Sequence, residues 1–206
     1  MWEELVKVAV TLFVVIDPMG TLPLFLSITR DSTEILRRQI ARRAVIVSFG
    51  VLVGFLFAGG TLLSGLGIEI PSFRIAGGIV MFIFALQMVF DTQNRHKEGS
   101  PEEGHDMAVY PLAIPAISGP GSMMTVVLMA EQYGSSLLMN LAIAGIIGLI
   151  LFATWLMLRY AGVIQSLIGS TGASIISRVM GLILAAMAIQ TVLTGIKTVF
   201  GWIPVA

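Results

Sequence analysis

Six apolar runs, each about as long as the hydrocarbon core of a bilayer is thick, dominate this sequence. They extend from Leu5 to Ile28, Ala44 to Leu63, Phe73 to Phe90, Val109 to Ala130, Ser136 to Leu158 and Ile176 to Phe200. A helix needs about 20 mainly apolar residues to cross roughly 30 Å of hydrocarbon. Only 12% of the residues are charged, whereas about a quarter is usual in a soluble domain. The sequence therefore predicts an all-α integral membrane protein with six transmembrane helices.

Basic residues are divided unevenly between the two sets of connections. One set and its flanks hold Arg30, Arg37, Arg38, Arg42, Arg43, Arg95, Lys97, Arg159 and Arg178, and the other holds Lys7, Arg74 and Lys197. Because Lys and Arg near the ends of spans are retained in the cytoplasm, we expect both termini to lie outside it.

The first connection, from Arg30 to Arg43, contains five arginines and two acids. A polar helix lying on anionic headgroups and an ordinary connector explain it equally well. The third connection, from Asp91 to Asp106, is rich in Gly, Ser and Pro, which predicts a mobile linker. Its His96 and His105 lack metal-ligand spacing, and the chain has no cysteine. We therefore expect no metal site and no disulfide. We also expect no nucleic-acid partner.

The two halves of the chain resemble each other at an offset of about 103 residues. FRIAGGI at residues 73–79 matches SRVMGLI at 177–183, and Gln87 is matched within one residue by Gln190. A unit of three spans that occurs twice enters the membrane from opposite sides, about a pseudo-two-fold axis in the membrane plane. We therefore predict one transmembrane domain over residues 1–206, formed by a 3+3 inverted repeat of residues 1–100 and 104–206.

The first span of each half contains helix breakers near its middle, DPMGTLP at residues 17–23 and PAISGPGS at 115–122. Proline lacks an amide proton, and glycine permits backbone angles that other residues resist, so both helices should be broken. Irregular backbone at membrane depth is tolerated only inside protein or beside a water-filled cavity. We therefore expect the two breaks to face each other at a cavity.

The ends of broken helices have opposite chemical preferences. A half-helix that begins at a break presents N–H groups and a positive dipole end, which suit a carboxylate. A half-helix that ends there presents carbonyls, which suit an ammonium group or a cation. Together they fit a zwitterion about as small as an amino acid. The alternative is that these prolines and glycines only make kinks or close helix contacts, as they often do in membranes.

Asp17 places a carboxylate inside a span. Such a group is costly there, which indicates a function as an ammonium ligand, a proton carrier or a cation ligand. The alternative is a structural cap on the half-helix after Pro18, since an aspartate before a first-turn proline satisfies free amides. The two roles are compatible.

The candidate substrate-binding residues are those at the breaks and nearby polar groups. They are Asp17, Pro18, Gly20, Thr21, Gln87, Ser118, Gly119, Pro120, Gly121, Ser122, Thr125 and Gln190. Gln87 and Gln190 could instead pin the third span against the sixth. The hydroxyls of Ser118, Ser122 and Thr125 can bond either to a ligand or to backbone.

Three glycines in the third and sixth spans, Gly77, Gly78 and Gly181, are expected at close helix contacts. The chain also has 12 methionines. They have no His or Cys partners in the spans, and we interpret them as adaptable packing.

These motifs resemble the MarC family of inner-membrane proteins, also called the small neutral amino acid transporter family. The likeness covers nearly the whole chain and rests on DPMG at 17–20 with Pro23, PLAIP at 111–115, SGPG at 118–121, RIAGG at 74–78 and RVMGL at 178–182. It implies a six-span bacterial or archaeal transporter of the cell inner membrane, with activity towards small neutral amino acids such as glycine and alanine. It implies no cofactor. A coupling proton or cation and a homo-oligomeric state stay open.

A channel or an exporter for another small solute, a cation or a drug would also use broken helices and an intramembrane carboxylate. Short polar backbone segments favour a small zwitterion over a bulky apolar drug. An enzyme is not expected, because the spans hold no histidine, cysteine or pair of carboxylates for acid–base or metal chemistry. A purely structural scaffold leaves the paired breaks unexplained.

Cysteine labelling tests the predicted topology. In intact cells an impermeant thiol reagent should label Trp2→Cys, near the N-terminus, and leave Glu102→Cys unlabelled until the membrane is opened. The reverse pattern would invert the orientation that the basic residues predict.

Overall fold

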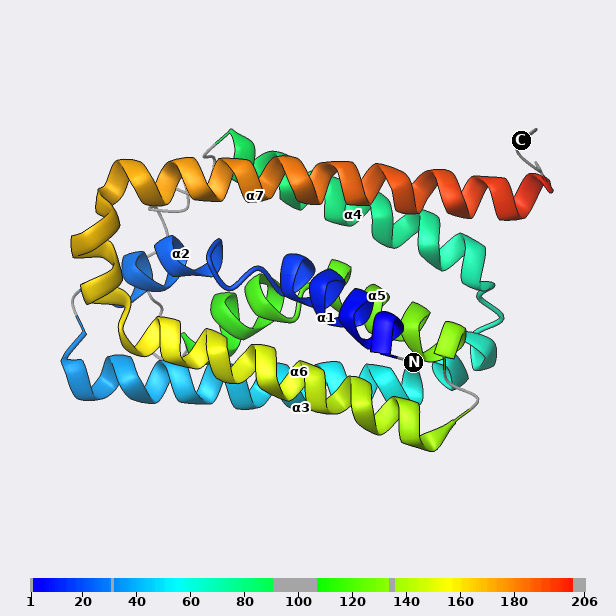
Figure 1. Cartoon of the computed structure of the whole chain (residues 1–206), viewed down its shortest axis with the longest axis horizontal. Coiled ribbons are helices and arrows are strands. Elements are labelled where there is room, and N and C mark those ends of the chain that lie inside the picture. Colours follow the sequence, from blue (N-terminus) through cyan, green and yellow to red (C-terminus); the bar gives the residue numbers. More distant parts are fainter. Residues whose placement is uncertain (1, 31, 91–106, 134–135, 202–206) are drawn as a thin grey trace.

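The computed structural model describes residues 2–30, 32–90, 107–133 and 136–201, and nearly all of these residues are helical. The elements in these ranges are α1 (Trp2–Ile16), α2 (Thr21–Ile28), α3 (Glu34–Gly65), α4 (Ile70–Val89), η2 (Ala108–Ile117), α5 (Pro120–Tyr133), α6 (Leu137–Arg159) and α7 (Ala161–Phe200) (Figure 1).

The expected all-α membrane fold is confirmed. Within the described ranges five stretches are long and apolar enough to cross a bilayer: Trp2–Leu26, Glu34–Gly65, Ile70–Val89, Leu137–Arg159 and Ser174–Phe200. The pair formed by η2 and α5, bent by 54°, is the sixth when it is counted as one span.

The basic segment between the first two spans is largely helical. Thr33 accepts a hydrogen bond from the N–H of Leu36 at 3.3 Å and so caps the start of α3. One turn later, Arg38 donates to Glu34 at 3.0 Å. From Glu34 onward the segment therefore forms the first turns of α3, continuous with the second span, and not a separate surface helix or a loop.

The stretch between the fifth and sixth predicted spans is also helical. It forms the first part of α7, and the chain changes direction at Gly169, whose φ of 72° and ψ of 167° are not helical. This positive φ is readily adopted only by glycine. The connection predicted from Asp91 to Asp106, with His96 and His105, lies outside the described residues.

The helices form two antiparallel pairs with the broken helices between them (Figure 1). α3 packs against α6 along one edge, and α4 packs against α7 along the other. α1 and α5 lie between these pairs and contact each other. The antiparallel directions are those that an inverted repeat requires, and superposition of residues 1–100 on 104–206 remains the test of the repeat.

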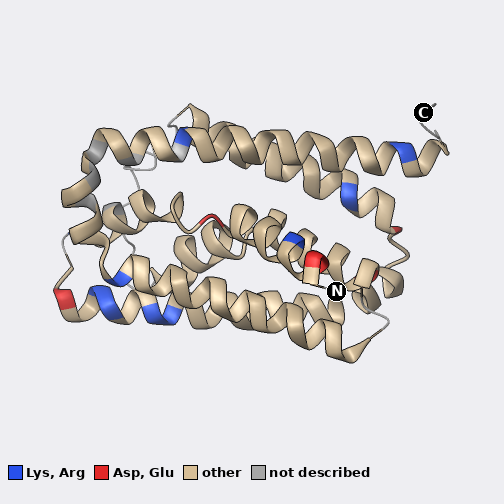
Figure 2. Ribbon diagram, in the orientation of Figure 1, with Lys and Arg blue, Asp and Glu red and all other residues tan. Residues whose placement is uncertain are grey.

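The Lys and Arg residues of the described chain are divided unevenly between the two ends of this bundle, and most lie at one of them. Lys and Arg gather at the end where α3 begins, while the start of α1 and the end of α7 share the opposite end (Figures 1 and 2). Both ends of the described chain therefore lie at the same end of the bundle, as an even number of crossings requires.

Glycines bring α4 and α7 into close contact, as predicted. A Cβ added to Gly78 would lie 3.0 Å from the carbonyl oxygen of Ala188, and one added to Gly181 would lie 3.0 Å from the carbonyl oxygen of Ala85. A Cβ on Gly77 would meet a methionine side chain of α5. These glycines serve helix packing, the driving force for which in lipid is van der Waals contact.

The α4–α7 contact predicts that substitution by alanine changes stability differently at two helical glycines. Gly78→Ala should lower stability by about 1–3 kcal/mol, because the methyl group meets backbone atoms of α7. Gly54→Ala in α3, where nothing lies within 4 Å of the added Cβ, should be neutral or stabilising through helix propensity. Thermal unfolding in detergent measures both, and equal stability of the two variants would contradict the packing role.

Candidate functional site

The first break is organised by Asp17. Its backbone is left-handed, with φ at 48°, and its Oδ1 accepts a hydrogen bond from the N–H of Gly20 at 3.0 Å. The hydroxyl of Thr21 donates to the Pro18 carbonyl at 2.9 Å. Asp17 therefore caps the start of α2, as one of its two predicted roles requires.

The second oxygen of Asp17 has no such partner. Oδ2 is buried and forms no hydrogen bond to the described residues, and the residue is only 3% exposed. A Cβ on Gly20 would collide with this oxygen and would lie 2.6 Å from Cε of Met88. Gly20 thus provides the space in which the carboxylate sits.

The expectation that glycines supply unusual backbone angles at the breaks is wrong. The described glycines with positive φ are Gly67, Gly169 and Gly201, all outside the breaks. The left-handed position is Asp17, one of the residue types that tolerate this conformation. The break glycines are instead needed for close approach, as at Gly121, where an added Cβ would lie 3.0 Å from the side chain of Met81.

The second break begins within η2. Tyr110 and Ile114 are extended, at φ and ψ of −126° and 130° and of −127° and 120°, because each precedes a proline that disfavours the helical region. The hydroxyl of Ser118 then donates to the carbonyl of Ala113 at 2.8 Å. The bend of 54° into α5 follows.

The two breaks meet inside the bundle, as predicted. The Ser122 hydroxyl, at the start of α5, lies 3.1 Å from the Ile117 carbonyl oxygen and 3.3 Å from that of Val15 in α1. Ser122 is 2% exposed and Ser118 is fully buried. The serine and threonine hydroxyls at the breaks therefore donate to backbone carbonyls of the interrupted segments.

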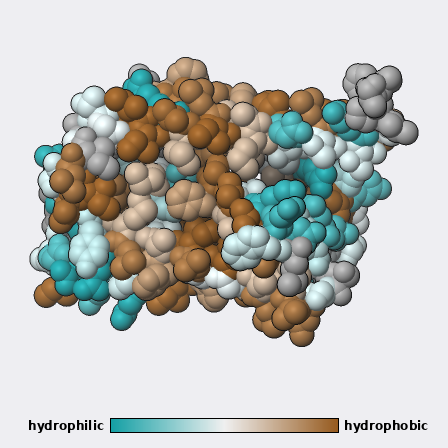
Figure 3. Space-filling view, viewed as in Figure 1, coloured by the Kyte–Doolittle hydropathy of each residue, from teal (hydrophilic) through white to brown (hydrophobic). Residues whose placement is uncertain are grey.

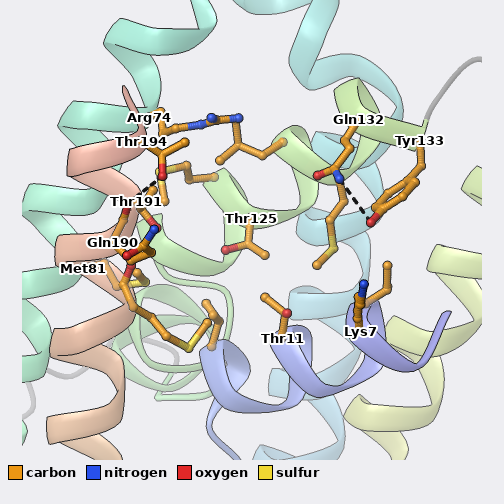
Figure 4. A pocket seen from close by; sticks show the side chains of 16 residues that line it. Lys7, Thr11, Arg74, Met81, Thr125, Gln132, Tyr133, Gln190, Thr191 and Thr194 are labelled. Carbon is orange, nitrogen blue, oxygen red and sulfur yellow. Dashed lines mark hydrogen bonds between the residues drawn. The ribbon is translucent and has the colours of Figure 1, made fainter. Parts of the chain in front are cut away.

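A cavity of about 290 Å³ lies beside this junction, between α1, α4, α5 and α7 (Figure 4). Its floor, next to the breaks, is formed by Val15, Met81, Met124 and Met187. Figure 3 shows hydrophilic residues around a hollow on this long face of the bundle, in the half that carries the N-terminus, whereas the middle of the face is mostly apolar. The cavity therefore opens in that half of the bundle and stops at a methionine-rich floor.

Polar side chains line the cavity above the floor. In the order of the chain they are Lys7, Thr11, Arg74, Thr125, Gln132, Tyr133, Gln190, Thr191 and Thr194. Figure 4 shows Arg74 reaching across from α4, Lys7 pointing in from α1, and Thr125 opposite Gln190 and Thr191. No carboxylate lines this cavity, and the described residues contain no group of three or more His, Cys, Asp or Glu able to hold a metal ion.

The structure divides the predicted site residues into three sets. Thr125 and Gln190 line the cavity, and Gln87 is exposed on α4 and does not line it. The remaining candidates lie at the breaks, beneath the floor: Asp17, Pro18, Gly20, Thr21, Ser118, Gly119, Pro120, Gly121 and Ser122.

Sequence reasoning missed most of the polar lining. In the sequence Arg74 contributes to the count of basic residues, the repeat and a family motif, and Lys7 to the count alone, and neither is predicted to line a cavity. A usable signal was the spacing of Gln190, Thr191 and Thr194, because residues three or four apart share one face of a helix. In an otherwise apolar span such a polar face indicates a cavity and not lipid.

Comparison with known proteins agrees with this architecture. A family model described as MarC family integral membrane protein matches residues 2–200, which include both breaks and every cavity-lining residue. The chain belongs to the MarC family. The resemblance seen in its sequence motifs is thereby confirmed.

Relatives of this MarC-family chain occur in bacteria and archaea. It is 34% identical to the UPF0056 inner membrane protein YhgN of Escherichia coli K12, over 95% of this chain and 97% of that one. It is 35% identical to the UPF0056 membrane protein YvbG of Bacillus subtilis, over 97% of each chain. A UPF0056 membrane protein of Archaeoglobus fulgidus is 34% identical, over 90% of this chain and 89% of that one. No solved structure matches the chain.

The cap geometry at Asp17 predicts how this MarC-family protein tolerates substitution there. Asp17→Asn keeps an acceptor for the Gly20 N–H and tolerates positive φ, so the melting temperature should change little. Asp17→Ala loses the cap and should cost about 0.5–2 kcal/mol, plus the strain of a left-handed alanine. Equal melting temperatures for the two variants would exclude a capping role.

Proposed function

We propose that this MarC-family protein transports small neutral amino acids, such as glycine and alanine, across the inner membrane. The observation that carries the proposal is the cavity, which opens in one half of the bundle and stops at the junction of two broken helices (Figure 3). Discontinuous helices commonly form the substrate sites of secondary transporters, where half of the protein moves around a fixed site.

The size of the cavity favours a small solute. About 290 Å³ lies at the lower end of the roughly 300–1,000 Å³ typical of small-molecule sites. A bulky drug would need a larger space. The polar lining, with two basic residues and several hydroxyl and amide groups, suits a ligand that is mostly charged or polar.

The closed floor favours a transporter over an open channel. Met81 and Met124 are 4% and 1% exposed, and Ala85 and Met88 continue the same buried cluster below them. A solute in the cavity therefore meets packed side chains between itself and the opposite end. Passage requires a conformational change that opens the other side, which is alternating access.

Asp17 is the group that we assign to coupling. It lies beneath the floor, and Oδ2 has no hydrogen-bond partner among the described residues. A buried carboxylate oxygen left without a donor favours binding of a proton or a cation. In this scheme the coupling ion acts at the first break while the cavity binds the solute, and the protein acts as a transporter and not an enzyme.

Transport in reconstituted vesicles tests the proposal. Wild-type protein should take up radiolabelled glycine and alanine, and Asp17→Asn should abolish uptake, because it removes the charge while keeping the cap. Gly121→Val should also abolish it, because a Cβ there lies 3.0 Å from Met81 and would push the floor into the cavity.

Glu131→Gln is the matched control for the loss of charge, since Glu131 is an exposed carboxylate of α5 that does not line the cavity. This variant should transport both amino acids at the wild-type rate. Wild-type vesicles that take up neither amino acid would overturn the proposed function. Wild-type rates for Asp17→Asn would show instead that the carboxylate is only a cap.

A further inference from the structure

The cavity carries positive charge without a compensating carboxylate. Lys7 lies on the wall formed by α1, and Arg74 lies on the wall formed by α4 (Figure 4). Neither forms an ion pair or a hydrogen bond with a described residue, and Nε of Arg74 is buried without a partner. No Asp or Glu is among the residues that line this cavity.

A buried cationic donor without an acceptor, such as Nε of Arg74, favours the binding of an anion. A buried polar group that lacks a partner is costly, and one with charge more so. The guanidinium group is planar and can donate two parallel hydrogen bonds to a carboxylate, whereas a lysine ammonium acts as a point charge. Arg74 is therefore suited to hold a carboxylate, and Lys7, which is exposed, to attract it at the mouth.

Two threonines on walls that face each other, Thr125 of α5 and Thr191 of α7, have the opposite chemistry (Figure 4). The hydroxyl of Thr125 donates its proton to the Gly121 carbonyl at 2.8 Å, and that of Thr191 donates to the Met187 carbonyl at 2.8 Å. A hydroxyl has one proton and two lone pairs, so these oxygens can only accept hydrogen bonds from a ligand. Acceptors without donors suit an ammonium group.

We infer that the cavity, and not the space between the breaks, binds the amino acid, with its carboxylate on Arg74 and its ammonium group on Thr125 and Thr191. This inference rests on the proposed function and names the binding site for it. The breaks lie below the methionine floor, where their hydroxyls already donate to backbone carbonyls. The side chain of the substrate lies against the floor, which limits it to a small apolar group.

Binding to the detergent-purified full-length protein tests this assignment with four probes: glycine, L-alanine, acetate and methylammonium. Isothermal titration measures each Kd. L-Alanine should bind more tightly than acetate, which has no ammonium group, and than methylammonium, which has no carboxylate. Acetate and methylammonium should each still bind weakly, at opposite ends of the site.

Variants separate the two ends of the site. Arg74→Gln should raise the Kd of L-alanine roughly 10- to 100-fold and abolish acetate binding, while leaving methylammonium unchanged. Arg74→Lys, which keeps the charge, should fall between Arg74→Gln and wild type and serves if the glutamine variant does not fold. Thr191→Val should raise the Kd of L-alanine about 3- to 10-fold and leave acetate unchanged.

Two residues outside the cavity are matched controls. Arg178 is the repeat counterpart of Arg74 on α7, and Thr198 donates to the Thr194 carbonyl at 2.9 Å in the same manner as Thr191 donates to Met187. Neither lines the cavity. Arg178→Gln and Thr198→Val should bind L-alanine with the wild-type Kd.

The outcomes distinguish the site from the function. If wild type and both Arg74 variants bind L-alanine equally, the site assignment is overturned and the proposed function stands. If wild type binds acetate through Arg74 but neither amino acid, the proposed function and the ammonium half of the site are overturned. If wild type binds none of the four probes, both proposals fail.

Discussion

The hydroxyl of Ser122 connects the two broken helices, and the centre of the molecule depends on this connection. It lies within hydrogen-bonding distance of the carbonyls of Ile117, in its own span, and of Val15, in the other broken helix. In hydrocarbon an unpaired backbone carbonyl costs several kcal/mol, so a helix can be interrupted there only where another part of the protein supplies a donor. Each break is completed by side chains from its own sequence, and the second break also supplies the Ser122 hydroxyl to the Val15 carbonyl of the first.

The arrangement of the other helices follows from that central requirement. Irregular backbone cannot face lipid, so the breaks of both spans lie between the pairs formed by α3 with α6 and by α4 with α7 (Figure 1). Apolar side chains such as Leu149 and Leu182, which are 69% and 59% exposed, lie on the outer helices, where lipid would cover them. Above the breaks, polar groups of α1, α4, α5 and α7 line a cavity and not a packed core.

Much of this fold was predictable from the sequence, whereas little of the cavity was. Span lengths and the two breaker motifs give the helices and their interruptions, because the cost of crossing a bilayer depends on local composition. The role of Asp17 as a cap was one of two open alternatives, since an aspartate before a proline has the same sequence signature in both roles. The cavity combines Lys7, Arg74 and Thr191 from three helices, and one-dimensional periodicity does not show which helix faces meet. The helical segment 161–168 lies between the predicted fifth and sixth spans, and it is too short for its composition to identify it as a helix.

The methionine floor determines how sharply the cavity can distinguish ligands by size. Methionine side chains are unbranched and flexible, so Met81, Met124 and Met187 can change rotamer without displacement of the helices that carry them. In a rigid apolar pocket one extra methylene changes binding by about 1–3 kcal/mol. A deformable floor reduces that penalty, so under the proposed function neighbouring members of a homologous series would be accepted together, with affinity declining gradually as their side chains lengthen. Such a transporter would be selective for the backbone atoms that its proposed substrates share and permissive towards the atoms in which they differ.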